Sequence, residues 1–309
     1  MDKMHRDILI KVFLFLIFFL FSFSLLGDPP EESSSKYFFA EFPHGEKKAE
    51  EAFLDLAERA REELNRRAPF PLEEPVRIVY CSTQKDFLFR SGMKPEHYLA
   101  SASAKNRTIY INGEFLRTRE PEESFSVLLH EYAHVYLGLT APEPLPHWLN
   151  EGLAMHLARD WSVFDTIRLS LAHVFKKTIP LSRLEAGFPQ DPSAIPLAYL
   201  QSYSLTDYII KRSSAKGDLS AFLNQLTDPR EGRRILEYLQ DPIIRDSLEH
   251  QWKKQLGGWW RNAVLILTSG SVLWFVLASL FLFAYVKKRQ QKKRQIKIWE
   301  EEERDYPFF

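Results

Sequence analysis

Apolar residues recur along this chain with two different periods, and the change between them predicts its architecture. From residue 46 to residue 67, alanine, leucine and phenylalanine return every three or four positions, which predicts an amphipathic helix. Two runs rich in β-branched residues, 76–82 and 107–112, predict strands of a small sheet. Between them we expect a short helix over 83–91 and mostly loop over 92–103.

Prolines divide the second half of the chain into helices. Residues 121–138 predict one apolar helix, and the three prolines of 140–146 end it before a second helix begins near Pro146. Further helices are predicted over 161–177, 196–211, 219–226, 230–239 and 242–256. The expected fold is α+β, in one domain over 46–258: a helix and a small β-sheet (46–120), two central helices (121–160) and a helical C-terminal subdomain (161–258).

The first 45 residues predict an export signal and a linker. Residues 1–27 begin with basic side chains and continue into the uncharged run 12–26, which is typical of a signal peptide or of an N-terminal membrane anchor. Both alternatives stay open. Residues 28–45 are rich in proline, serine and glutamate, which predicts a linker.

The C-terminal region predicts a transmembrane helix. Residues 263–286 contain 24 residues without a charge, enough to cross a bilayer, and Trp259 and Trp260 precede them. Seven basic residues follow within 287–297, which predicts a cytoplasmic tail at 287–309. The segment from about residue 28 to residue 258 is then expected on the extracytoplasmic side, with a single membrane span, or two spans if the N-terminal segment is retained as an anchor.

Charge and cysteine content narrow the possible functions. The chain has 41 basic and 41 acidic residues, and this zero net charge argues against a nucleic-acid partner. Its one cysteine, Cys81, cannot form an intrachain disulfide and lies in an apolar run, so we expect it to be buried in a strand.

A metal-site motif lies in the apolar helix predicted over 121–138. His130-Glu131-Tyr-Ala-His134 matches H-E-x-x-H, which places two imidazoles one helical turn apart on one face and a carboxylate beside them. The second helix carries Glu151, the expected third ligand, with His147 as the alternative. Two nitrogens, one carboxylate oxygen and an open fourth position predict a catalytic Zn²⁺ site rather than a structural one.

The motif His130-Glu-Tyr-Ala-His134, followed by Trp148-Leu-Asn-Glu-Gly-Leu-Ala154, resembles the gluzincin zinc metallopeptidases, and most of all the peptidase MA-like domains distantly related to M1 aminopeptidases. The resemblance implies that His130, His134 and Glu151 bind zinc. It also implies that Glu131 is the general base and later the proton donor. A tyrosine on a later helix steadies the oxyanion in such domains, and Tyr199 fits that place best, with Tyr203 as the alternative.

Two departures limit what the resemblance implies. The Gly-x-Met-x-Asn motif of M1 aminopeptidases is missing, since this chain has Ser101-Ala-Ser-Ala-Lys-Asn-Arg107 upstream. Recognition of a free substrate N-terminus is therefore unsupported. Met155 stands four residues after Glu151, where thermolysin-like relatives have an aspartate that orients a ligand histidine, so the partner of that histidine stays unassigned.

Together these features predict a membrane-anchored zinc metallopeptidase that hydrolyses peptides or proteins, with an endopeptidase favoured. The exposed edge of the predicted sheet either pairs with the substrate backbone or serves only as scaffold. Two alternative functions remain: a catalytically inactive, membrane-tethered metal-binding or interaction module, and a zinc hydrolase of a non-peptide amide or ester.

Overall fold

The computed structural model describes residues 31–43, 47–93, 99–116, 119–185, 187–213, 217–268 and 270–305. The predicted signal peptide or N-terminal anchor, residues 1–27, lies outside these ranges. The chain forms two compact units. The first contains the described residues up to Leu169 together with Thr178–Glu249, and the second contains Ser170–Lys177 and the described residues from His250 onward.

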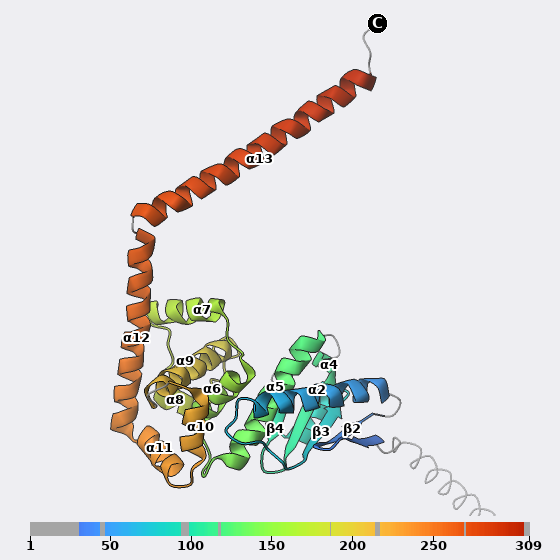
Figure 1. Ribbon diagram of the computed structural model, residues 1–309, viewed down its shortest axis with the longest axis vertical. Helices are drawn as coiled ribbons and strands as arrows, with labels where there is room; N and C mark the ends of the chain where they lie inside the picture. The colour runs from blue at the N-terminus through green and yellow to red at the C-terminus, as the bar shows by residue number, and fades with distance from the viewer. Residues whose placement is uncertain are drawn as a thin grey trace, which may run out of the picture. The chain divides into compact units, whose positions relative to one another are not determined.

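The first unit is built on a mixed sheet of five strands in the order β1-β2-β3-β5-β4 (Figure 1). The central strands β2, β3 and β5 are parallel, and β1 and β4 pair antiparallel at the two edges. The strands are β1 (Glu31–Ser34), β2 (Phe38–Phe42), β3 (Val76–Cys81), β4 (Ala100–Ser103) and β5 (Thr108–Asn112). The α+β class and the two predicted strands are confirmed.

Three of these strands were not expected from the sequence, and two of them lie inside the predicted linker 28–45. That prediction is wrong over 31–42, where β1 and β2 belong to the sheet. The buried side chains of Phe38, Ala40 and Phe42 alternate along β2, whose backbone pairs with β3. The strand β4 has the sequence Ala-Ser-Ala-Ser, without bulky β-branched residues, so its pairing with β5 rather than its own propensity makes it a strand.

Helices cover both faces of the sheet. Helices α2 (Lys47–Asn65) and α5 (Pro121–Thr140) lie on the face that carries Phe38, Phe42 and Tyr80, and the ring of Phe38 packs 5.6 Å from that of Tyr132 in α5. On the other face, α3 (Gln84–Ser91) packs Phe87 against Val79 and Cys81. Cys81 is fully buried, as predicted.

Three helices form the centre of the helical part. Helix α6 (His147–Ala158) packs between α5 and α9 (Ile195–Ser213). A Cβ added at Gly152 of α6 would meet Thr206 Oγ1 at 2.1 Å and the Ser202 carbonyl oxygen at 2.5 Å, both in α9. The glycine therefore allows the two backbones to approach closely. Further helices of this unit are α4 (Gly113–Leu116), α8 (Leu181–Glu185), α10 (Leu219–Thr227) and α11 (Glu231–Gln240).

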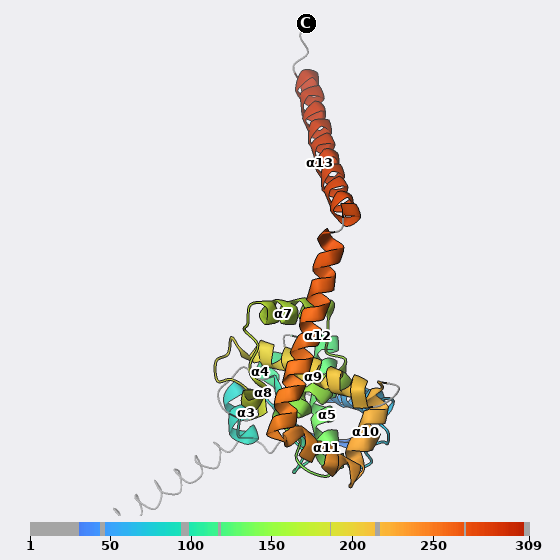
Figure 2. The same ribbon diagram turned by 90° about the vertical axis from the view of Figure 1, so that its left-hand side faces the viewer.

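The second unit consists mainly of long helices. Helix α7 (Val163–Val174) enters it, α12 (Pro242–Thr268) contributes its second part, and α13 (Gly270–Asp305) continues through the predicted tail (Figure 2). The described residues of the uncharged run 263–286 are helical, in α12 up to Thr268 and in α13 from Gly270. Among the described residues, no helix combines the length and apolar composition that crossing a bilayer requires.

The close approach of α6 and α9 predicts that Gly152→Ala destabilises the fold. The added methyl group has no room, and overpacking of this kind costs about 1–3 kcal/mol. Gly258→Ala in α12 is the matched control, because nothing lies within 4 Å of its Cβ position and alanine favours a helix by roughly 0.5–1 kcal/mol. Urea unfolding of the two variants beside the wild type measures the difference. Equal stability of the two variants would contradict the packing argument.

Candidate metal site

Helix α5 brings the two motif histidines together. It begins at Pro121, with Glu122 and Glu123 in its first turn, where acidic side chains complement the positive helix end. Its other faces are buried in the core, so His130 and His134 project together from the remaining face. Their Nε2 atoms are 3.1 Å apart, which is close enough for both to contact one ion.

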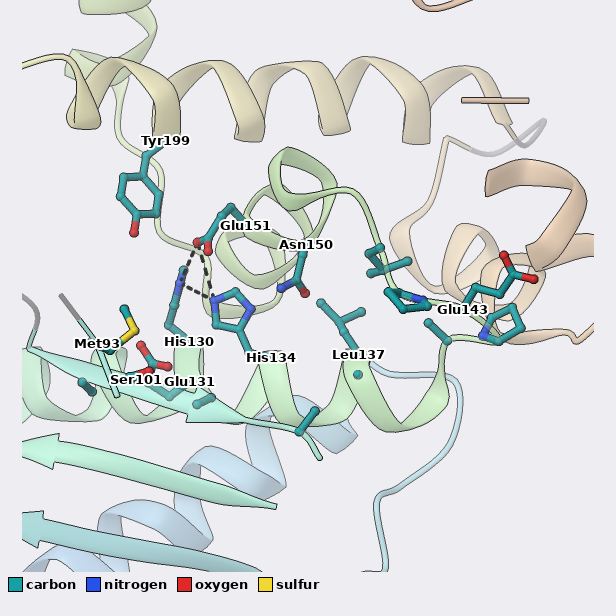
Figure 3. A pocket seen from close by; sticks show the side chains of 18 residues that line it. Met93, Ser101, His130, Glu131, His134, Leu137, Glu143, Asn150, Glu151 and Tyr199 are labelled. Carbon is teal, nitrogen blue, oxygen red and sulfur yellow. Dashed lines mark hydrogen bonds and ion pairs between the residues drawn. The ribbon is translucent and has the colours of Figure 1, made fainter. Parts of the chain in front are cut away.

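Helix α6 supplies the third group. Trp148, Leu149 and Leu153 are fully buried and fix the orientation of this helix, so Glu151 faces the histidines. Glu151 Oε2 lies 3.5 Å from His130 Nε2 and 3.5 Å from His134 Nε2 (Figure 3). His130, His134 and Glu151 therefore form a group that can hold a metal ion.

The geometry of this group fits a tetrahedral metal. Bonds of about 2.0–2.2 Å from zinc to nitrogen and oxygen imply ligand atoms roughly 3.3 Å apart, and the three observed separations are 3.1, 3.5 and 3.5 Å. The buried Glu151 Oε2 has no well-formed hydrogen bond, since 3.5 Å is too long for one. A cation at the centre would satisfy this oxygen. Two imidazoles and a carboxylate suit zinc among the common ions.

The charged groups of this site shift one another's pKa values. Burial is the largest single effect on His134 and lowers its pKa, but the charges of Glu151 and Glu131 and the polar contacts with Glu151 and Asn150 together outweigh burial and raise the pKa to about 9. Burial alone raises the pKa of Glu151, yet the positive charge of His134 and the polar contacts with both histidines together hold that pKa well below its usual range. A bound metal would displace the imidazole protons and take over their role as counter-charge.

Glu131 lines the same pocket without belonging to the ligand group. Burial raises the pKa of its carboxyl group, and the positive charges of His134 and His130 reduce that rise. A carboxylate with a raised pKa accepts and releases protons closer to neutral pH than an exposed one does. Glu131 thus combines a place in the pocket with a raised pKa.

The pocket around these residues is an open groove of about 630 Å³. One side is formed by β4 with Ser101, and the other by the turn after α5 with Glu143 and by α6 with Asn150 (Figure 3). Because β4 is an edge strand of the described sheet, one side of its backbone lacks a strand partner in the described part of the chain.

The two candidate tyrosines have different positions. Tyr199 lines the pocket, with its hydroxyl directed towards the ligand group (Figure 3), and its ring packs edge-on against Phe188, 4.7 Å away. Tyr203 is stacked between His156 and Trp161, at ring separations of 3.9 and 4.2 Å, and does not line the pocket. The geometry favours Tyr199 of the two.

The other histidines of α6 lie outside the ligand group. His147 is half-exposed, its ring lies 4.5 Å from the ring of Phe188 in a tilted arrangement, and its Nε2 lies 4.0 Å from Glu151 Oε1. The ligand group found among the described residues contains Glu151 and omits His147. His156 is packed against Tyr203, with the two rings stacked 3.9 Å apart.

Two residues near the site were missed by sequence reasoning. Asn150 directly precedes Glu151 and faces the His134 ring, whose Nδ1 is buried without a well-formed hydrogen bond (Figure 3). Its polar contact raises the pKa of His134, less than the effects of Glu151 and Glu131 do and against the lowering effect of burial. Phe188, from the loop before α9, contacts both His147 and Tyr199. The Asn-Glu pair was visible in the sequence, whereas nothing in the loop sequence indicated Phe188.

The position of Asn150 predicts that Asn150→Ala weakens metal binding. An amide that orients a ligand imidazole contributes about 10–100-fold to metal affinity. Competition of the purified protein with a chelator measures that affinity. His147→Ala is the matched control and should leave the affinity unchanged, because His147 is not in the ligand group. A larger loss in the His147 variant would show that the two roles are reversed.

Comparison with known proteins agrees with this geometry. A search among curated proteins found no significant match. The sequence profile described as Peptidase MA superfamily matches residues 95–256, just over half of the chain, including β4, β5, α5, α6 and α9. The matched region therefore contains all three ligand residues, Glu131 and Tyr199. The chain belongs to the Peptidase MA superfamily.

Proposed function

We propose that this protein is a zinc-dependent metallopeptidase that cleaves peptide bonds within a chain. The observation that carries the proposal is the convergence of His130, His134 and Glu151 in an open groove that Glu131 also lines. Zinc bound by the three ligands would polarise a substrate carbonyl group and make water a stronger acid. A scaffold that only stored zinc would need neither the groove nor Glu131.

Glu131 acts as the proton carrier of the reaction. As a carboxylate it accepts the proton of the attacking water, and it then donates that proton to the nitrogen of the leaving amine. Its raised pKa suits both halves of this transfer, since the proton must be taken up and released within one turnover.

Tyr199 stabilises the charge that develops on the substrate carbonyl oxygen. Its hydroxyl is directed towards the ligand group, and its edge-on contact with Phe188 limits the motion of the ring. A hydrogen bond donated by a held hydroxyl group stabilises an oxyanion more than it stabilises the neutral carbonyl group.

A peptide fits the groove better than a small ester or amide does. The edge strand β4 runs along the groove, so an extended substrate can add to the sheet through backbone hydrogen bonds. Because the Gly-x-Met-x-Asn motif is missing, recognition of a free amino terminus is unsupported, which favours an endopeptidase. Within the superfamily, the His-Glu-x-x-His and Asn-Glu motifs support a gluzincin distantly related to M1 aminopeptidases.

We further propose that residues 263–286 anchor the protein in a membrane, with the catalytic domain extracytoplasmic and the tail cytoplasmic. The run has 24 uncharged residues and precedes seven basic ones. Large apolar side chains from Trp274 to Val286 are exposed on all sides of α13, as in a helix surrounded by lipid. In alkaline carbonate extraction the protein should stay with the membranes, and its release into the supernatant would contradict the anchor.

Glu131→Gln should abolish hydrolysis of a casein-like substrate while zinc stays bound. The amide cannot take up the water proton, so kcat should fall by about 10²–10⁴-fold. Metal content is measured in the same preparation, and His130→Ala is the control that loses the metal. If the wild type binds zinc yet cleaves no peptide, the metal-binding interaction module becomes the better explanation. If the wild type cleaves only esters or non-peptide amides, a zinc hydrolase of such substrates becomes the better explanation.

Tyr199→Phe should lower kcat by about 10²–10³-fold and leave KM nearly unchanged, because the lost hydrogen bond forms in the transition state. Tyr203→Phe is the matched control, since Tyr203 lies in a stacked cluster outside the groove. Steady-state kinetics of the two variants decide between the tyrosines. A stronger effect at Tyr203 than at Tyr199 would refute the assignment.

A further inference from the structure

Helix α7 exposes its apolar face instead of burying it. Six large apolar residues on it are exposed: Val163 (76%), Phe164 (73%), Ile167 (39%), Leu171 (37%), Val174 (40%) and Phe175 (67%). With 3.6 residues per turn they occupy a sector of about 120°. Phe175 extends the helix by one residue, because its N–H donates to the Leu171 carbonyl oxygen. We name these six residues the α7 stripe.

The opposite side of α7 faces protein. Leu169 is buried, and helical periodicity places it opposite the stripe. A contiguous exposed apolar surface on one helix is uncommon in a soluble protein and marks a binding surface. The α7 stripe therefore has the properties of a surface that binds another apolar surface.

The position of α7 along α12 indicates which phase that is. Within the second unit, His173 Nε2 lies 3.4 Å from the Cβ position of Gly257, so the two helices touch there (Figure 2). Gly257 precedes Ala263, the start of the uncharged run, by six residues, or about 9 Å along the axis of α12. If the run is in a bilayer, α7 touches α12 at the depth of the lipid headgroups.

Charges at the border of the stripe match an anionic surface. Arg168, Lys176 and Lys177 are exposed on or directly after α7. Asp165 is the one acidic residue between positions 163 and 177. Its carboxylate accepts a hydrogen bond from the Ser162 hydroxyl group at 2.6 Å and lies 3.7 Å from Arg168. Basic residues beside an apolar helix face are the composition of helices that lie in membrane interfaces.

We propose that α7 is an interfacial helix whose apolar stripe enters the outer part of an anionic lipid bilayer, with Arg168, Lys176 and Lys177 on the headgroups. This inference rests on the proposed anchor at 263–286. It adds a second contact that binds the second unit along the membrane surface, whereas the anchor alone leaves the rotation of α12 about its axis free.

The test uses the full chain in vesicles with a fluorescent probe on α7. Cys81 is fully buried, and burial raises the pKa of its thiol to about 12, so an introduced cysteine can be labelled selectively. The probe is placed in Ile167→Cys or Phe175→Cys, and in Tyr238→Cys as a matched control on an exposed side chain outside α7. Vesicles contain equal parts of phosphatidylcholine and phosphatidylglycerol, with a nitroxide quencher near the headgroups.

Both α7 probes should shift their emission to the blue and be quenched, while the Tyr238 probe remains unquenched. Reversing the charges with Arg168→Glu, Lys176→Glu and Lys177→Glu should reduce the quenching to the level in phosphatidylcholine alone. Unquenched α7 probes, or equal quenching at all three positions, overturn the inference. A blue shift of the α7 probes without quenching by the nitroxide, which grows with protein concentration, also overturns the inference. In that case a second copy of the protein would cover the stripe.

Flotation of the same samples separates this inference from the proposals it rests on. If the protein floats with the vesicles and the α7 probes are unquenched, the anchor stands and the interfacial helix falls. If the protein does not float, both fall. Hydrolysis of the casein-like substrate is measured independently, because none of the substituted residues lines the groove.

Discussion

The tight packing of α6 between α5 and α9 is the constraint on which the site depends. Glu151 reaches the two histidines only if the α6 backbone is close to both neighbours, and Gly152 beside it removes the side chain that would hold α9 away. Trp148, Leu149 and Leu153 lock the same helix from its buried sides. The ligand geometry is thus set by core packing, which is stiff, rather than by the ligands themselves.

The same packing produces the electrostatics of the groove. A carboxylate and two imidazoles are forced together in a largely buried place, where each charge is unfavourable unless another balances it. The mutual effect appears in the raised pKa of His134 and the lowered pKa of Glu151. A divalent cation resolves this conflict better than protons do, because it satisfies all three groups at once. Glu131, outside the ligand group, has a raised pKa of its own, caused by burial.

Helices α7 and α13 differ from the core around the site. In that core, apolar side chains are turned inward and a few polar groups are buried. Along α7, which both units share, and along the described part of α13, large apolar side chains are exposed, and basic residues lie beside them or follow them in the sequence. An apolar exterior with basic borders is the complement of an anionic bilayer, just as a buried acidic and imidazole cluster is the complement of a metal ion.

The sequence alone determined the local features of this protein. Spacing along one helix is sufficient to pair His130 with His134, and the apolar periods identified the α+β class, most helices and two strands, because these depend on near neighbours in the chain. It failed for β1, β2 and β4, whose composition resembles a linker or a loop and which exist because β3 and β5 supply their hydrogen bonds. The sequence also did not decide between Glu151 and His147 as third ligand or between Tyr199 and Tyr203 as the oxyanion tyrosine. It did not indicate the contacts of Asn150 and Phe188 either. Each of these depends on how far one helix or loop approaches another, and that distance is fixed only when the whole core packs.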